Sequence, residues 1–124
     1  MHLLRNMMAS QNELVVKPWG YEIIWAKTDK YVGKILHITK GKRLSLQYHE
    51  KKEETVLVKT GILIMQVGDE TRYLGPGETC HVPPGTVHRM GAGDADCEVI
   101  EVSTPELDDV VRLADDFARA TVSS

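Results

Sequence analysis

Three side chains that can bind a divalent metal lie close together in the sequence, between Gly41 and Gly61. They are Gln47, His49 and Glu54, in a segment that reads as two short strands around a charged turn. Successive side chains of a strand point to opposite faces, so Gln47 and His49 share a face, and Glu54 can point back at His49 from the second strand. Burying an amide, an imidazole and a carboxylate together is costly unless a partner such as a divalent cation satisfies them.

A second segment supplies a fourth candidate ligand. His88 follows a Pro-Pro-Gly turn at residues 83–85, shortly after a strand-like run at 79–82. A single histidine on a strand is more often structural or exposed than a ligand, so His49 alone carries little weight. The recurrence of a histidine at the start of another predicted strand changes this. The four residues together predict a mixed nitrogen and oxygen site with positions left open to water or substrate.

Both segments resemble the two sequence motifs of the cupin superfamily. The first family motif is Gly, five residues, His-x-His, three or four residues, Glu, six residues, Gly. The second is Gly, five residues, Pro-x-Gly, two residues, His, three residues, Asn. This sequence places Gln47 at the first histidine and Ala92 at the asparagine, and otherwise matches at Gly41, His49, Glu54, Gly61, Gly77, Pro83, Gly85 and His88.

The glutamine is similar to the phosphomannose isomerase branch of that superfamily. From about Lys17 to Arg119 the chain resembles the C-terminal isomerase domain of the bifunctional type II phosphomannose isomerase/mannose-1-phosphate guanylyltransferases. The resemblance is carried by KPWGYE at 17–22, GKRLSLQYH at 41–49, VPPGTVHR at 82–89, IEV at 100–102 and DDVVRLADDFAR at 108–119. It departs at residues 50–56, where EKKEETV replaces the family's His-x-Arg-x-Glu-His-Trp. The metal ligand is kept there, but its basic and aromatic neighbours are not.

This resemblance implies a zinc-dependent isomerase that interconverts aldose and ketose sugar phosphates, as mannose-6-phosphate isomerase does. Imidazole and oxygen ligands alone also fit iron, manganese, cobalt or nickel. Isomerisation needs an electrophile on the carbonyl and a base that moves a proton between neighbouring carbons. Glu101, at the family's IEV position, is the candidate base, although the strand pattern leaves its direction open. Lys34 and Arg89 are candidates to hold a phosphate, with Arg112 as a third.

Two other functions fit the same residues. One is a different metal-dependent cupin enzyme, such as an iron dioxygenase acting on a small organic acid. The other is a non-catalytic sugar-binding or regulatory cupin, which the altered residues 50–56 favour. Oxygen uptake would separate the first of these from an isomerase, and a sugar-phosphate screen would separate the second.

Short strands punctuated by ten glycines and five prolines predict an all-β fold, a single-domain jelly-roll barrel. The barrel is expected over residues 15–120, after a loosely ordered segment at 1–14. In the strand at 31–39, Lys34 should share the inner face with Leu36 and Ile38, and His37 should point the other way. Beyond Thr104, helical spacing of apolar residues predicts a short C-terminal helix, with Leu107, Val110, Val111, Ala114, Phe117 and Ala118 on one side.

Composition narrows the choice of partners. A length of 124 residues fits one domain, and the net charge of −3 argues against a nucleic-acid partner, which usually requires a basic surface. No apolar run is long enough for a signal peptide or a membrane span, so a cytoplasmic protein is expected. Cys80 and Cys97 lack the spacing of a metal or disulfide motif.

A homodimer is expected, because small barrels present sheet edges and this chain has aromatic residues near its start.

Overall fold

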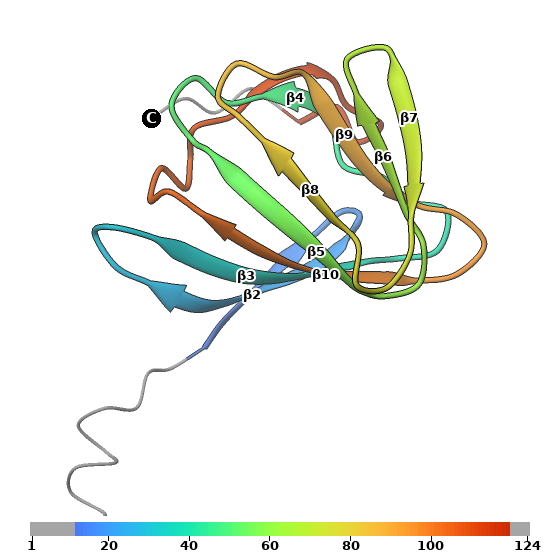
Figure 1. Ribbon diagram of the computed structural model, residues 1–124, viewed down its shortest axis with the longest axis horizontal. Helices are drawn as coiled ribbons and strands as arrows, with labels where there is room; N and C mark the ends of the chain where they lie inside the picture. The colour runs from blue at the N-terminus through green and yellow to red at the C-terminus, as the bar shows by residue number, and fades with distance from the viewer. Residues whose placement is uncertain (1–11, 120–124) are drawn as a thin grey trace, which may run out of the picture.

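The structure, a computed structural model, describes residues 12–119 as two antiparallel β-sheets that face each other (Figure 1). The larger sheet has six strands in the order β1-β2-β3-β10-β5-β8. Their bounds are β1 Glu13–Lys17, β2 Gly20–Lys27, β3 Val32–Ile38, β10 Cys97–Ser103, β5 Glu54–Thr60 and β8 Thr79–Val82.

The smaller sheet has five strands in the order β11-β4-β9-β6-β7. Their bounds are β11 Val111–Ala114, β4 Leu46–Tyr48, β9 His88–Ala92, β6 Leu63–Val67 and β7 Glu70–Leu74. Neighbours in this sheet come from distant parts of the sequence, since β9 pairs with both β4 and β6. The two cupin-like segments are thereby brought side by side.

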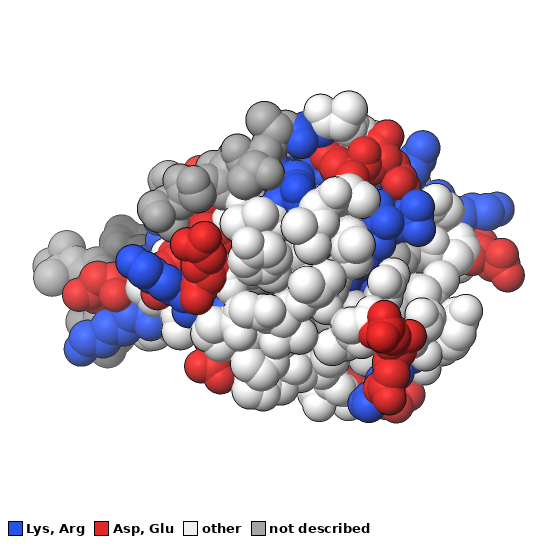
Figure 2. All heavy atoms as spheres, turned by 90° about the horizontal axis from the view of Figure 1, so that it is seen from above, with Lys and Arg blue, Asp and Glu red and all other residues white. Residues whose placement is uncertain are grey.

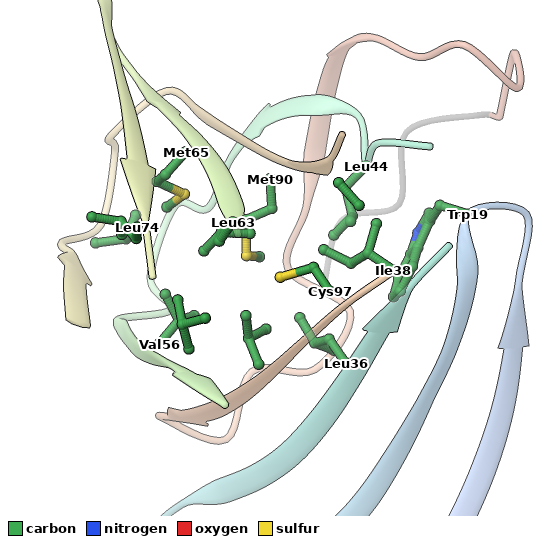
Figure 3. Close-up of a cluster of buried hydrophobic side chains, with 14 residues drawn as sticks. Trp19, Leu36, Ile38, Leu44, Val56, Leu63, Met65, Leu74, Met90 and Cys97 are labelled. Carbon is green, nitrogen blue, oxygen red and sulfur yellow. The ribbon is translucent and has the colours of Figure 1, made fainter. Parts of the chain in front are cut away.

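The apolar core lies between the two sheets (Figure 3). Alternation buries every second side chain in several strands, as in β5, where Val56 and Val58 are buried and Leu57 is exposed. Met65 of β6 and Cys97 of β10 are fully buried between the two sheets. Cys97 and Cys80 are both free thiols. Trp19, Leu36, Leu44 and Met90 of this core also line the cavity of the site described below, together with polar side chains.

The all-β prediction is confirmed, and most strands lie where the sequence pattern places them. β8 begins and ends at the predicted residues, and β3 differs from the predicted 31–39 by one residue at each end. The strand β1 was not predicted. It begins at Glu13, inside the segment 1–14 that was expected to be loosely ordered; residues 1–11 of that segment lie outside the described residues.

The predicted C-terminal helix is wrong, because no helix occurs between residues 12 and 119. Val111 and Arg112 instead pair with Tyr48 and Gln47, so that β11 covers the edge of β4. The edge of a sheet leaves a row of unpaired backbone groups, and pairing them outweighs a helical pattern carried by β-branched valines of weak helix propensity. Phe117 still packs against the core, and Leu113 is exposed.

Charged groups of both signs are mixed on the surface seen in Figure 2. On this face, uncharged residues occupy the middle, and the Lys/Arg and Asp/Glu side chains lie mostly toward the rim, often next to one another. Such a face lacks the continuous basic area that a phosphate backbone needs. The described residues also include no helix long and apolar enough to cross a membrane.

Candidate metal centre

Three strands bring the candidate ligands to one end of the barrel. Gln47 of β4 lies directly opposite His88 of β9, and Glu54 begins β5 in the facing sheet. His49 follows β4 and accepts a 2.7 Å backbone hydrogen bond at its carbonyl from the amide of Gly85, within the Pro-Pro-Gly turn. Gly85 has φ +77°, a conformation that glycine adopts without strain. This turn therefore ties the two motifs together.

The imidazoles of His49 and His88 converge on one oxygen of Glu54. His49 Nε2 lies 3.1 Å and His88 Nε2 lies 3.0 Å from Glu54 Oε1. All three residues are buried, and their ligand-capable atoms lie within 4.8 Å of one another. Gln47 is also buried and lines the same cavity, with its amide nitrogen 3.4 Å from the carbonyl oxygen of Ser45.

Backbone carbonyls fix which nitrogen of each histidine carries a proton. Nδ1 of His49 lies 2.5 Å from the carbonyl oxygen of Asp109, and Nδ1 of His88 lies 2.9 Å from that of Thr86. A carbonyl only accepts hydrogen bonds, so Nδ1 must be the donor in both rings. When the rings are neutral, each Nε2 then directs a lone pair toward Glu54.

This arrangement fits a divalent cation. Two imidazole lone pairs and a carboxylate oxygen face one another in a buried space, with no donor between them. His88 Nε2 makes no hydrogen bond among the described residues despite its short contact with Glu54, and neither does Glu54 Oε2. Unsatisfied buried polar atoms are costly, and imidazole with carboxylate is a common ligand set for zinc and other transition metals.

A buried ion pair stands beside the ligands. Lys52 Nζ lies 3.2 Å from Glu101 Oε2 and 3.7 Å from Glu54 Oε2, and all three side chains are buried. Burial alone would lower the pKa of Lys52, but the carboxylates of Glu101 and Glu54 raise it above its ordinary value. The single ammonium thus balances two carboxylates.

The two glutamates ionise in different pH ranges. Burial opposes ionisation of Glu54, yet Lys52 and the neighbouring polar groups hold the pKa of Glu54 well below its ordinary value. Burial and the charge of Glu54 raise the pKa of Glu101 to about 7, against the opposing effect of Lys52. Glu54 is therefore charged near neutral pH, whereas Glu101 can gain or lose a proton there.

A cavity of about 380 Å³ opens onto these groups. Lys34 lies on its wall and is buried, as is its partner Glu22, whose Oε2 is 3.1 Å from Lys34 Nζ. The C-terminal segment supplies another part of the wall. The polar side chains that line the cavity are Glu13, Lys17, Glu22, Lys27, Lys34, Ser45, Gln47, His49, Lys52, Glu54, His88, Glu101, Asp108, Arg112 and Arg119.

Of the residues that the sequence suggests for catalysis, Glu101 and Lys34 line the cavity and Arg89 does not. Arg89 follows His88 on β9 and points to the other side of the strand. Its Nε donates a 2.8 Å hydrogen bond to the carbonyl of Leu44, and its Nη2 lies 3.1 Å from Asp116 Oδ1. Arg112 lines the cavity from β11, where burial and the nearby Arg119 lower its pKa.

Lys52 and Asp109 are two polar residues next to the proposed ligands that sequence reasoning missed. Lys52 had a usable signal, because it precedes Glu54 by two residues and so shares the inner face of the strand when the alternation is extended backwards. It also occupies the position of the arginine in the related motif, so one basic neighbour of the ligand is retained. Asp109 contacts the site through backbone groups of residues far away in the sequence, for which no local pattern exists.

Comparison with known proteins identifies relatives that cover most of the described region. Residues 5–115 match the model of the family described as mannose-6-phosphate isomerase C-terminal. A mannose-1-phosphate guanylyltransferase of Escherichia coli (strain K12) is 34% identical over 110 residues, which make up 85% of this chain and 23% of that protein. The chain therefore spans less than a quarter of the length of this relative.

Solved structures share the fold. KdgF from Halomonas sp. superposes with a TM-score of 0.71 at 25% identity, over 81% of this chain and 92% of that one. An RmlC-like cupin from Shewanella frigidimarina has a TM-score of 0.70 at 17% identity, over 80% of this chain and 88% of that one. The predicted cupin barrel is thereby confirmed.

Proposed function

Because this chain belongs to the mannose-6-phosphate isomerase C-terminal family, we propose that it is a metal-dependent isomerase that interconverts an aldose phosphate and a ketose phosphate. The observation that carries the proposal is the convergence of His49, Glu54 and His88 beside a second, protonatable carboxylate in one cavity. The convergence supports a cation, and the carboxylate supports proton transfer.

The ligands of the cation would be His49 Nε2, His88 Nε2, a carboxylate oxygen of Glu54 and the amide oxygen of Gln47. Zinc is the metal that the family favours, and iron, manganese, cobalt and nickel suit the same ligands. Bound there, the cation would polarise the substrate carbonyl and so acidify the proton on the neighbouring carbon.

Glu101 would move that proton. A general base works best when its pKa is near the working pH, and the pKa of Glu101 is raised to about 7. Lys52, at 3.2 Å, orients the carboxylate and stabilises its charged form. Lys34 and Arg112, on the cavity wall, would hold the phosphate, since charge-assisted hydrogen bonds to an anion are strong. Arg89 would act indirectly, by holding the C-terminal segment through Asp116.

The test is to follow aldose–ketose conversion by ¹³C NMR, with metal-loaded protein and a panel of sugar phosphates that includes mannose 6-phosphate. The matching unphosphorylated sugars serve as controls. Conversion of a phosphorylated sugar alone is expected, and Glu101→Gln should slow it by about 100-fold or more, as for a lost general base. Glu98→Gln is the matched control, because Glu98 lies on the opposite face of the same strand and pairs with Lys59.

Two results would replace this proposal with the alternatives. Oxygen consumption by the iron-loaded protein with a small organic acid, and no sugar conversion, would favour a dioxygenase. Binding of sugar phosphates without conversion under any metal would favour a non-catalytic sugar-binding protein, to which the changed residues 50–56 also point.

A further inference from the structure

Asp109 is a buried carboxylate that belongs to no strand and does not line the cavity of the site, yet its side chain accepts hydrogen bonds from three backbone amides beside the site. Its Oδ2 accepts from the amides of Lys51 at 2.7 Å and Lys52 at 2.9 Å, and its Oδ1 accepts from the amide of Glu50 at 3.1 Å. Three successive backbone donors therefore close around one anionic side chain.

The same residue contacts the metal centre through its backbone. The carbonyl oxygen of Asp109 accepts the Nδ1 proton of His49. His49 and the turn at 50–52 are consecutive in the sequence, so Asp109 holds a candidate ligand and the turn that follows it at the same time. Nothing in the proposed chemistry requires Asp109 to touch a substrate.

We infer that Asp109 is a positioning residue, which locks the turn 50–52 through its carboxylate and presents Nε2 of His49 to the metal through its carbonyl. The inference rests on the proposed metal centre and adds a residue from the C-terminal segment to it. Partners that orient a metal-binding histidine from behind are often worth 10- to 100-fold in metal affinity.

The hydrogen bonds of Asp109 to the turn 50–52 also affect the position of Lys52. The turn 50–52 ends in Lys52, whose ammonium lies between Glu54 and Glu101. A displaced turn would therefore move both the His49 ring and the cation that balances the two carboxylates. The segment at 104–110 is in this way part of the site, although its side chains supply none of the proposed ligands.

The test compares Asp109→Ala with Asp94→Ala, an exposed aspartate that does not line the cavity. Competition with a chromophoric chelator measures zinc affinity. Asp109→Ala should weaken zinc binding by about 10- to 100-fold, and Asp94→Ala by less than about threefold. Asp109→Asn keeps one acceptor oxygen for the turn, so its affinity should fall between wild type and Asp109→Ala.

A second measurement is independent of zinc. In metal-free protein, ¹⁵N NMR of the imidazole should show His49 protonated at Nδ1, and Asp109→Ala should raise the population protonated at Nε2. General destabilisation would not change this tautomer in the folded protein. A folded Asp109→Ala or Asp109→Asn variant with the wild-type tautomer and zinc affinity would overturn the inference, as would a wild-type His49 protonated at Nε2 alone.

The two measurements also separate this inference from the proposed function. A wild-type protein that binds no zinc or other divalent metal would contradict the proposed function. The tautomer of His49 would then still decide whether Asp109 positions the ring.

Discussion

Lys52 carries the positive charge that balances two carboxylates inside the barrel. Its side chain is 7% exposed, and the side chains of Glu54 and Glu101 are 1% and 4% exposed. Water therefore screens none of these charges effectively. Removing the ammonium leaves two buried carboxylates beside each other, which is much more costly than breaking an exposed ion pair.

We predict that Lys52→Met destabilises the metal-free protein by about 3–5 kcal/mol, the usual cost of removing one partner of a buried ion pair. Urea unfolding at neutral pH measures it. Lys59→Met is the matched control: Lys59 forms a 3.0 Å pair with Glu98, but its side chain is 51% exposed, so the loss should be below about 1 kcal/mol. Lys52→Arg should retain most of the stability, because the positive charge remains. Equal losses for both methionine variants would contradict this account.

His37 points away from the site and lies between two carboxylates. Its Nδ1 is 3.1 Å from Glu98 Oε2 and its Nε2 is 3.0 Å from Asp96 Oδ2, while Tyr21 stacks on the ring. The hydrogen bond with Glu98, together with Asp96 and against partial burial, raises the pKa of His37 above its ordinary 6.5. The folded state therefore holds the proton more tightly than the unfolded state.

This pKa shift predicts a pH-dependent contribution to stability. The gain is fully present below the unfolded pKa of 6.5 and is lost as the pH rises through the higher folded pKa. The difference in unfolding free energy between wild type and His37→Gln should be larger in mildly acidic than in mildly alkaline buffer. The change should be at most about 1 kcal/mol, the range of a partly exposed ion pair. Thermal unfolding across this pH range tests it, and a difference that grows with rising pH would refute it.

Two glycines fix the backbone at the ends of the first motif for different reasons. Gly41 and Gly61, which bracket the first motif, have φ of +74° and +77°. A Cβ on Gly41 would meet nothing within 4 Å, whereas one on Gly61 would lie 2.4 Å from the backbone oxygen of Asp96. Gly61 is therefore required both for its conformation and for the close approach of β10.

Replacing each glycine with alanine should separate these two requirements. Gly41→Ala should cost about 1–2 kcal/mol for the left-handed conformation alone. Gly61→Ala should cost a further 1–3 kcal/mol, roughly the penalty of forcing extra atoms into a packed region. Denaturant unfolding of the two variants measures the difference. If Gly41→Ala destabilises the protein at least as much as Gly61→Ala, the close approach of Asp96 does not determine the requirement for glycine at position 61.

Sequence patterns predict the elements well where side chains alternate. β8 and β10 follow the alternation, and the glycine and histidine spacing brings His49, Glu54 and His88 to the same end of the barrel. The C-terminal segment shows where local patterns fail. Its apolar spacing suits a helix, but β11 satisfies the open edge of β4, and this competition depends on residues about 65 positions away. The role of Asp109 depends on similar long-range backbone contacts.

At the scale of the whole molecule, the residues that the structure describes leave sheet edges and an apolar face exposed. β1 and β8 are the edges of the larger sheet. On its outer surface, Leu14, Ile23, Ile35, Ile100 and Leu57 face one another in a row across five strands. Leu14 and Leu57 are 64% and 37% exposed.

These features support the expected homodimer, because small barrels shield such surfaces by association. Light scattering of the purified protein at tens of micromolar should give twice the mass of one chain. A monomer at this concentration would argue against self-association.

Metal content tests the central claim, that this barrel holds a divalent cation on His49, Glu54 and His88. Elemental analysis of purified protein should find about one metal ion per chain in wild type and in His37→Ala, and little in His49→Ala or His88→Ala. The bound metal should also raise stability by about 2.7 kcal/mol at 100 times its Kd, since it binds only the folded chain. Wild-type protein without metal after reconstitution, or equal metal in His49→Ala and His37→Ala, would contradict the claim.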